Sequence, residues 1–176
     1  MKKKFSFLLF VVWIMLVQGC GYTLSSTLPS RLNTIHITLF KNAIDFSEAN
    51  KRNLYFPMLE VDVKNALSDE FLFNGRLKIA DEDTADLVLK GELRNYQRQA
   101  LRYTDNNDVQ EYRVLITVSL QLWDNTHEKN MWTESAFVGQ ATYFVTGAQA
   151  TTEESAVQEA IKDLAKRVVE RTVEYW

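Results

Sequence analysis

Apolar and polar residues alternate along much of the C-terminal half of this chain, with the period of two that is typical of β-strands. The most regular run covers 112–122, where every second side chain is apolar. Alternation recurs at 87–93, and again from about Met131 to Val145, where the apolar positions switch parity and indicate a β-bulge or an edge strand. Polar turn residues separate these three segments, so we expect an antiparallel meander.

Two further segments repeat apolar residues at helical spacing. Pro57 is expected to open the first helix and Asn74-Gly75 to end it. A capping box, Thr151-x-x-Glu154, is expected to start the second helix. The apolar stripes of the two helices are Leu59, Val63, Ala66, Leu67 and Phe71, and then Val157, Ile161, Leu164, Val168 and Tyr175.

A strand at 34–40 and a polar loop at 41–56 precede the first helix, which gives the order β-α-β-β-β-α. Because a strand, a helix and a second strand favour a right-handed crossover, we predict an α+β fold of two layers. It consists of a four-stranded mixed sheet with both helices on one face, in a single domain over 34–176. The other face of this sheet would be left uncovered.

The N-terminus has the three parts of a secretory signal peptide, predicted over 1–19. Lys2, Lys3 and Lys4 precede an apolar stretch at 5–17, and Cys20, the only cysteine, follows it after Gln18 and Gly19. Val17-Gln18-Gly19-Cys20 resembles the lipobox of bacterial lipoproteins, whose cysteine is acylated, and two or more acyl chains anchor a protein stably. The alternative is an ordinary signal peptide with a chance cysteine near its cleavage site.

Acylation of Cys20 would make 20–33 a short tether between the lipid and the fold. In Gram-negative lipoproteins an aspartate directly after the cysteine favours the inner membrane. This chain has Gly21 there, which favours the outer membrane.

Composition and charge exclude several function classes. Loss of the three signal-peptide lysines lowers the basic residues from 20 to 17 against 23 acidic ones, so the mature chain has a formal charge of −6 and is not a general nucleic-acid binder. His36 and His127 have no metal-ligand spacing, and the chain has no glycine-rich phosphate loop and no G-x-S-x-G elbow. We therefore expect no enzyme activity, metal or cofactor, although a hydrolase with carboxylates paired in three dimensions stays open as an alternative.

Basic residues gather on the predicted open face of the sheet. Strand parity puts Arg94, Arg98 and Arg102 in one row with Tyr96 among them, and Arg113 starts the next strand on the same side. Guanidinium groups in such a row bind phosphate in bidentate fashion. The alternative is that they only keep an exposed sheet soluble and protect its edge.

The chain as a whole resembles the LPS-assembly lipoprotein family, LptE. The marks of the resemblance are Gly19-Cys20-Gly21-Tyr22-Thr23-Leu24, the strand ending in Phe40 followed by Asn42, Gly75-Arg76-Leu77, Ala85-Asp86-Leu87-Val88-Leu89-Lys90-Gly91-Glu92-Leu93, and the last helix after Glu153-Glu154-Ser155-Ala156.

The resemblance implies an outer-membrane lipoprotein that plugs the LptD β-barrel, supports its assembly and takes part in delivering lipopolysaccharide to the outer leaflet. Arg94, Arg98, Arg102 and Arg113 are then hypothesised to contact lipopolysaccharide phosphates, an assignment that rests on strand parity alone. The rival is another outer-membrane lipoprotein, for example a regulator of a peptidoglycan synthase, although the short tether keeps the domain close to the membrane.

Overall fold

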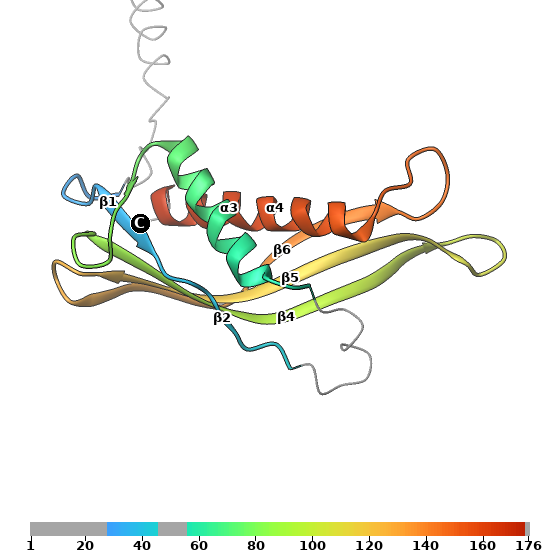
Figure 1. Ribbon diagram of the computed structural model, residues 1–176, viewed down its shortest axis with the longest axis horizontal. Helices are drawn as coiled ribbons and strands as arrows, with labels where there is room; N and C mark the ends of the chain where they lie inside the picture. The colour runs from blue at the N-terminus through green and yellow to red at the C-terminus, as the bar shows by residue number, and fades with distance from the viewer. Residues whose placement is uncertain (1–27, 46–55, 175–176) are drawn as a thin grey trace, which may run out of the picture.

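The computed structural model describes residues 28–45 and 56–174, which form a two-layer α+β domain (Figure 1). Cys20 and Tyr175 lie outside the described residues. The elements, in chain order, are β1 (Thr34–Ile37), β2 (Lys41–Asn42), α3 (Leu59–Asn74), β3 (Lys78–Ile79), β4 (Leu87–Tyr103), β5 (Val109–Asp124), β6 (Lys129–Phe144) and α4 (Glu153–Glu174).

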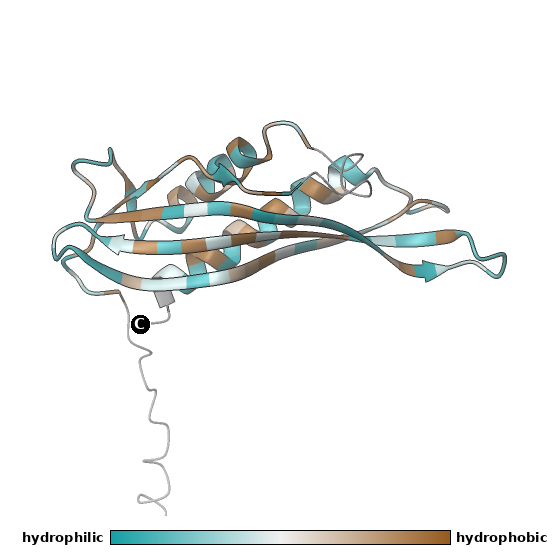
Figure 2. Cartoon of the chain, turned by 90° about the horizontal axis from the view of Figure 1, so that it is seen from below, coloured by the Kyte–Doolittle hydropathy of each residue, from teal (hydrophilic) through white to brown (hydrophobic). Residues whose placement is uncertain are grey.

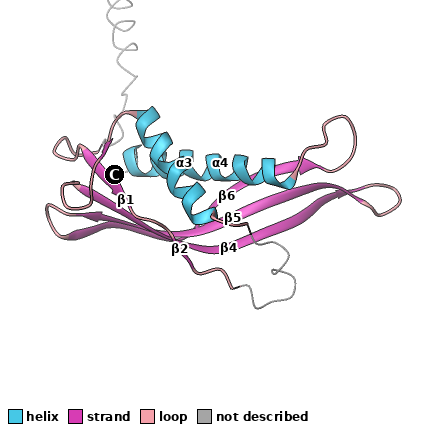
Figure 3. Ribbon diagram, in the orientation of Figure 1, coloured by secondary structure: helices cyan, strands magenta, loops and turns pink. Residues whose placement is uncertain are grey.

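Both helices lie on one face of a mixed sheet, as the sequence predicts (Figure 3). The sheet has six strands rather than four, in the order β3-β1-β4-β5-β6, with β2 paired to β4 beyond the end of β1. The pairs of β1 with β3 and of β1 and β2 with β4 are parallel, and β4, β5 and β6 form the predicted antiparallel meander. The two extra strands have two residues each, which is too short to produce a periodic signal.

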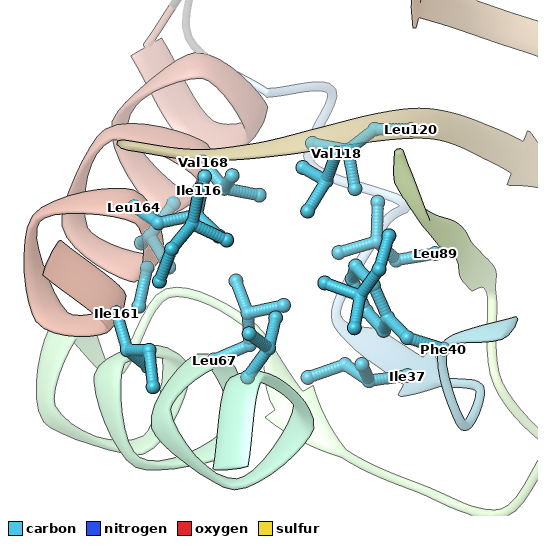
Figure 4. Close-up of a cluster of buried hydrophobic side chains, with 14 of the residues drawn as sticks. Ile37, Phe40, Leu67, Leu89, Ile116, Val118, Leu120, Ile161, Leu164 and Val168 are labelled. Atoms are coloured by element: carbon cyan, nitrogen blue, oxygen red, sulfur yellow. The ribbon is translucent and has the colours of Figure 1, made fainter. Parts of the chain in front are cut away.

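One hydrophobic core fills the space between the helices and the sheet (Figure 4). Leu67 of α3 and Leu164 of α4 meet Ile116 and Val118 of β5 there, and all four are at most 1 % exposed. The alternation of β5 therefore has a direct cause, because its even-numbered residues face the helices and its odd-numbered residues face the open side.

The helix ends differ in detail from the prediction. α3 begins at Leu59 rather than at Pro57, since Met58 takes a left-handed conformation (φ 62°) and its carbonyl accepts the first helical hydrogen bonds. The predicted stop is confirmed, because α3 ends at Asn74 and Gly75 takes the left-handed cap (φ 72°).

The predicted capping box of α4 is wrong by one residue. Thr152, not Thr151, is the cap, and its Oγ1 accepts a hydrogen bond from the Ser155 N–H at 3.1 Å. The sequence motif fits only at Thr151, which has Glu154 three residues later, whereas Thr152 is followed at that spacing by Ser155. The consequence is that Glu153, not the exposed Glu154, turns toward the sheet.

A β-bulge in β4 changes which side chains face the helices. The pairing with β5 shifts between Leu93, which pairs with Val118, and Asn95, which pairs with Thr117. Beyond this point Tyr96 pairs with Ile116, and its side chain is 2 % exposed in the core. The expectation that Tyr96 lies on the open face is therefore wrong. β6 is also irregular and lies at the edge of the sheet, as its parity switch predicts.

Side chains of α4 cover part of the outer edge of β6. The Asp163 carboxylate accepts a hydrogen bond from the Gln140 N–H at 3.0 Å, and the Arg167 guanidinium donates to the Val138 carbonyl. Asp163 and Arg167 are themselves 3.8 Å apart. These two side chains occupy backbone groups that another strand would otherwise pair with, which is a recognised way to protect an edge strand.

The segment before β1 is fixed to the fold rather than loose. Leu28 and Leu32 are buried. Asp86 accepts hydrogen bonds from the N–H groups of Asn33 (2.8 Å) and Thr34 (3.0 Å). Partial burial raises the pKa of Asp86, but these bonds outweigh it and hold the pKa below its usual value. Of the predicted tether, only residues 20–27 precede the described fold. A segment of this length spans at most roughly 26 Å, at about 3.3 Å per residue.

Neither helix of the described part combines the length and the apolar character that a membrane span requires.

Candidate functional site

Figure 2 shows the sheet from its open face, with the helices behind it. Three of the four predicted arginines lie on this face. Their partners on β5 or their own positions show this, because the odd-numbered residues of β5 face the open side. Arg94 donates to Ser119, Arg102 lies beside Glu111, and Arg113 is itself an odd-numbered residue of β5. Arg98 does not lie on this face, because it follows the bulge and pairs with the buried Val114. The predicted row of Arg94, Arg98 and Arg102 is therefore wrong at Arg98, whereas Arg113 lies on the open face as expected.

Arg94 lies in a groove of about 550 Å³ where β2, β4, β5 and β6 meet on the open face. Lys41 and Lys90 also line this groove, and Glu92 is its one carboxylate. The Arg94 Nε donates to Ser119 Oγ at 3.1 Å, and its Nη2 lies 3.3 Å from Glu92 Oε2. The remaining polar lining consists of hydroxyl and amide groups, from Thr38, Ser119, Gln121, Thr133 and Ser135.

The groove combines three cations with hydrogen-bond donors in a chain whose overall charge is negative. Such a combination favours an anionic ligand, with phosphate as the natural match for a guanidinium and two ammonium groups. Sequence reasoning did not assign Lys41 or Lys90 to the site. The parity of β4 gives Lys90 the correct face, whereas Lys41 falls in a stretch that the sequence predicts as a loop.

Arg102 and Arg113 form a second basic region further along the same face. Arg102 lies 3.6 Å from Glu111 and its guanidinium lies 5.7 Å from the centre of the Phe144 ring. Arg113 pairs in register with Gln99 and Thr142. Arg113 is six residues from Ser119 along β5, a separation of roughly 20 Å at about 3.3 Å per residue. One phosphate group cannot contact both regions.

Arg98 belongs to a network on the helix face. Glu153, at the start of α4, accepts hydrogen bonds from Arg98, from the Tyr96 hydroxyl at 2.7 Å and from the Tyr143 hydroxyl at 3.3 Å. The Arg98 guanidinium also lies 5.0 Å from the centre of the Tyr112 ring. Arg98 thus joins the sheet to the helix, and this role explains its place without a ligand.

The network changes the pKa of its members. Burial, and then the hydrogen bond and charge of Glu153, raise the pKa of Tyr96 well above its ordinary value, and burial with the Glu153 charge raises that of Tyr143. Burial opposes the charge of Arg98, but the bond to Glu153 outweighs it and raises the Arg98 pKa. The hydroxyl groups of Tyr96 and Tyr143 therefore stay protonated, and Arg98 stays charged, to a higher pH than the same groups would in water.

Both histidines have structural partners. His36 Nδ1 lies 3.0 Å from the Ala80 carbonyl, and His127 lies 3.3 Å from the buried Asp124. Asp124 also pairs with Arg31 at 2.6 Å. Burial raises the pKa of Asp124, but the bonds from Arg31 and His127 outweigh it and lower the pKa. Over 28–45 and 56–174, no three metal-ligating side chains come together.

Comparison with solved structures shows that this fold occurs in other bacterial proteins. The chain is similar to an uncharacterized lipoprotein B of Nitrosomonas europaea, with 12% identity, 87% of this chain and 88% of that chain covered, and a TM-score of 0.53. A protein of Xanthomonas campestris is similar at 8% identity, with 83% and 88% covered and a TM-score of 0.53. A hypothetical protein of Chlamydia trachomatis is similar at 12% identity, with 80% and 95% covered and a TM-score of 0.51. At these identities the likeness shows the fold alone.

Fold and groove together define a small two-layer α+β domain with cations and hydroxyl groups in a groove on the open face of its sheet. No curated protein sequence matches the chain. The model of the LptE family, described as lipopolysaccharide-assembly, matches residues 32–173. The chain belongs to this family, as the resemblance of its sequence motifs indicates.

Proposed function

We propose that this chain is an outer-membrane lipoprotein that plugs the LptD β-barrel and takes part in delivering lipopolysaccharide to the outer leaflet. Its family membership over nearly the whole described domain carries the proposal. The N-terminal pattern supports it, with a signal peptide at 1–19 and acylation of Cys20. The short segment between Cys20 and Leu28 supports it as well, because it keeps the domain within reach of the membrane. The role is one of binding and assembly rather than catalysis.

Within this role, the groove at Lys41, Lys90 and Arg94 is the proposed contact for lipopolysaccharide phosphates. Arg102 and Arg113 offer a second contact toward the end of the β4–β5 hairpin, which extends beyond the helices (Figure 1). Arg98 is not among the proposed ligand contacts, because its guanidinium donates to Glu153. A lipopolysaccharide molecule carries several phosphates, so two separate basic regions on one face suit it better than they suit a single free phosphate.

The partner is tested by affinity purification of the tagged, lipidated protein from detergent-solubilised outer membranes. We expect a large β-barrel, identified by mass as LptD, in near-equal amount, and a diacylglycerol-modified Cys20 in the intact mass. The matched control is the Cys20→Ala chain, which lacks the acyl chains. Recovery of a peptidoglycan synthase, or of no barrel, would contradict the plug.

The ligand groove is tested by replacing Lys90 and Arg94 together with glutamate. Each lost charge-assisted contact costs about 1.5 kcal/mol, so the loss of two corresponds to about 100-fold weaker lipopolysaccharide binding. Solvent screens exposed charges, so we expect binding to be at least tenfold weaker. Exposed Lys129 and Lys166 lie outside the groove, so Lys129→Glu with Lys166→Glu is a control of equal charge change. Equal loss of binding in both double variants would mean that only the net charge matters and that the groove is not the site.

A further inference from the structure

The outer surface of α3 is unusual for a solvent-exposed helix. Its inner face is apolar and buried, through Leu59, Val63, Leu67 and Phe71. Its last turn also exposes two large apolar side chains, Leu72 at 62% and Phe73 at 88%. An exposed Phe beside an exposed Leu has no role in the core of this domain, and such adjacent apolar side chains are typical of contact surfaces.

Acidic side chains line the groove beside Phe73. A groove of about 500 Å³ runs between α3 and α4, with Phe73 on its rim and Asp62, Asp69 and Glu70 along it. Lys162 is the one cation of its lining, and its ammonium is 2.8 Å from Glu159 Oε1, so it is already paired. Asp62, Asp69 and Glu70 form no ion pair within the described residues. The groove is therefore negative.

The same charges are unfavourable for α3 itself. Asp69 and Glu70 lie toward its C-terminal end, where the helix dipole favours cations, and its last turn has no basic residue. Local stability therefore does not account for either the carboxylates or the exposed aromatic ring. A partner that supplies positive charge would compensate both the helix end and the groove.

We propose that the α3–α4 groove with Phe73 on its rim is the surface that docks a cationic, arginine-bearing segment of the barrel wall. A guanidinium can pair with Asp69 and Glu70 in bidentate fashion and lie over the Phe73 ring, an arrangement that gains strength when water is excluded. A lipid phosphate would be repelled by the three carboxylates. The domain thus has two opposite functional sides, the open sheet face for anions and the helix layer for a basic protein. This inference rests on the proposed function.

The test compares two double charge reversals in the same affinity purification from outer membranes. Asp69→Lys with Glu70→Lys changes the groove, and Glu82→Lys with Asp83→Lys makes the same charge change at an exposed acidic pair in a turn outside it. We expect the groove variant to recover at least tenfold less LptD, and the turn variant to stay within twofold of the wild type. Lipopolysaccharide binding and the far-UV circular dichroism spectrum should be unchanged in both.

A second measurement keeps the inference testable if the groove variant folds poorly. Phe73→benzoylphenylalanine leaves every charge in place, and its ring is exposed, so photolysis should cross-link it to LptD. If the groove variant recovers as much LptD as the wild type and position 73 gives no cross-link, the docking surface is overturned, whereas the proposed plug role stands. Failure of the wild type itself to recover LptD would overturn both the docking surface and the proposed plug role. A cross-link to lipopolysaccharide or to a second copy of the chain would overturn the docking surface alone.

Discussion

Replacing Gly139 with valine is expected to lower the free energy of unfolding by about 3 kcal/mol, at the upper end of what overpacking a core costs. Gly139 lies on β6 where α4 crosses it. A Cβ built there would lie 2.4 Å from the Ala160 carbonyl oxygen and 2.5 Å from Leu164 Cβ. Backbone of a long helix cannot move aside locally, so α4 as a whole would have to shift away from the sheet.

Urea denaturation of the folded domain measures this effect. For a protein of this size, about 3 kcal/mol also corresponds to roughly 6–12 °C in the midpoint of thermal unfolding. Ala136→Val on the same strand is the matched control, because Ala136 is exposed and valine suits a strand, so its effect should stay within about 0.5 kcal/mol. An unchanged midpoint for Gly139→Val would show that α4 does not need this close approach.

The layers of the fold could be predicted because long periodic segments carry them. The even-numbered residues of β5 and the apolar stripe of α4 give unambiguous faces, and these two elements contribute much of the core. Two-residue strands such as β2 carry no such signal, since they form only where β4 offers a neighbouring edge. Their presence is a consequence of the sheet rather than of their own residues.

The candidate site could be predicted only in part, for a reason that lies in β4. Period two assigns faces correctly as far as the strand is regular, and Lys90 and Arg94 are both on the open face as parity requires. The bulge after Leu93 reverses the parity, so Tyr96 and Arg98 turn to the helices. No glycine or proline lies between Leu93 and Tyr96 to indicate the bulge, so the sequence pattern of β4 does not show where its parity reverses.

The second large effect is expected at Glu153. Glu153→Ala removes the acceptor of the Tyr96 hydroxyl, the Tyr143 hydroxyl and the Arg98 guanidinium at once. Tyr96 is 2 % exposed, so its hydroxyl cannot turn to water instead. A buried donor without a partner costs about 1–3 kcal/mol, and the lost charge-assisted bond adds to it, so we expect a destabilisation of about 2–4 kcal/mol.

Glu154→Ala is the matched control for this variant. Glu154 lies in the same first turn of α4 and has the same favourable interaction with the helix dipole, but its side chain is exposed. Its loss should cost no more than about 1 kcal/mol in urea denaturation. Equal losses for the two glutamates would mean that the helix dipole, and not the network, accounts for the effect.

The pH dependence of stability gives the network a second, independent signature. Burial and Glu153 raise the folded-state pKa of Tyr96 above the ordinary value of 10.0, so the unfolded chain loses this proton first as the pH rises. The contribution of Tyr96 is therefore complete below pH 10 and decreases above it, by up to about 1.4 kcal/mol for each pH unit. Tyr96→Phe has no proton to lose, so its stability should fall less steeply above pH 10 than that of the wild type. Parallel curves for the two proteins would show that Tyr96 titrates freely in the folded state, and that Glu153 does not hold its hydroxyl proton.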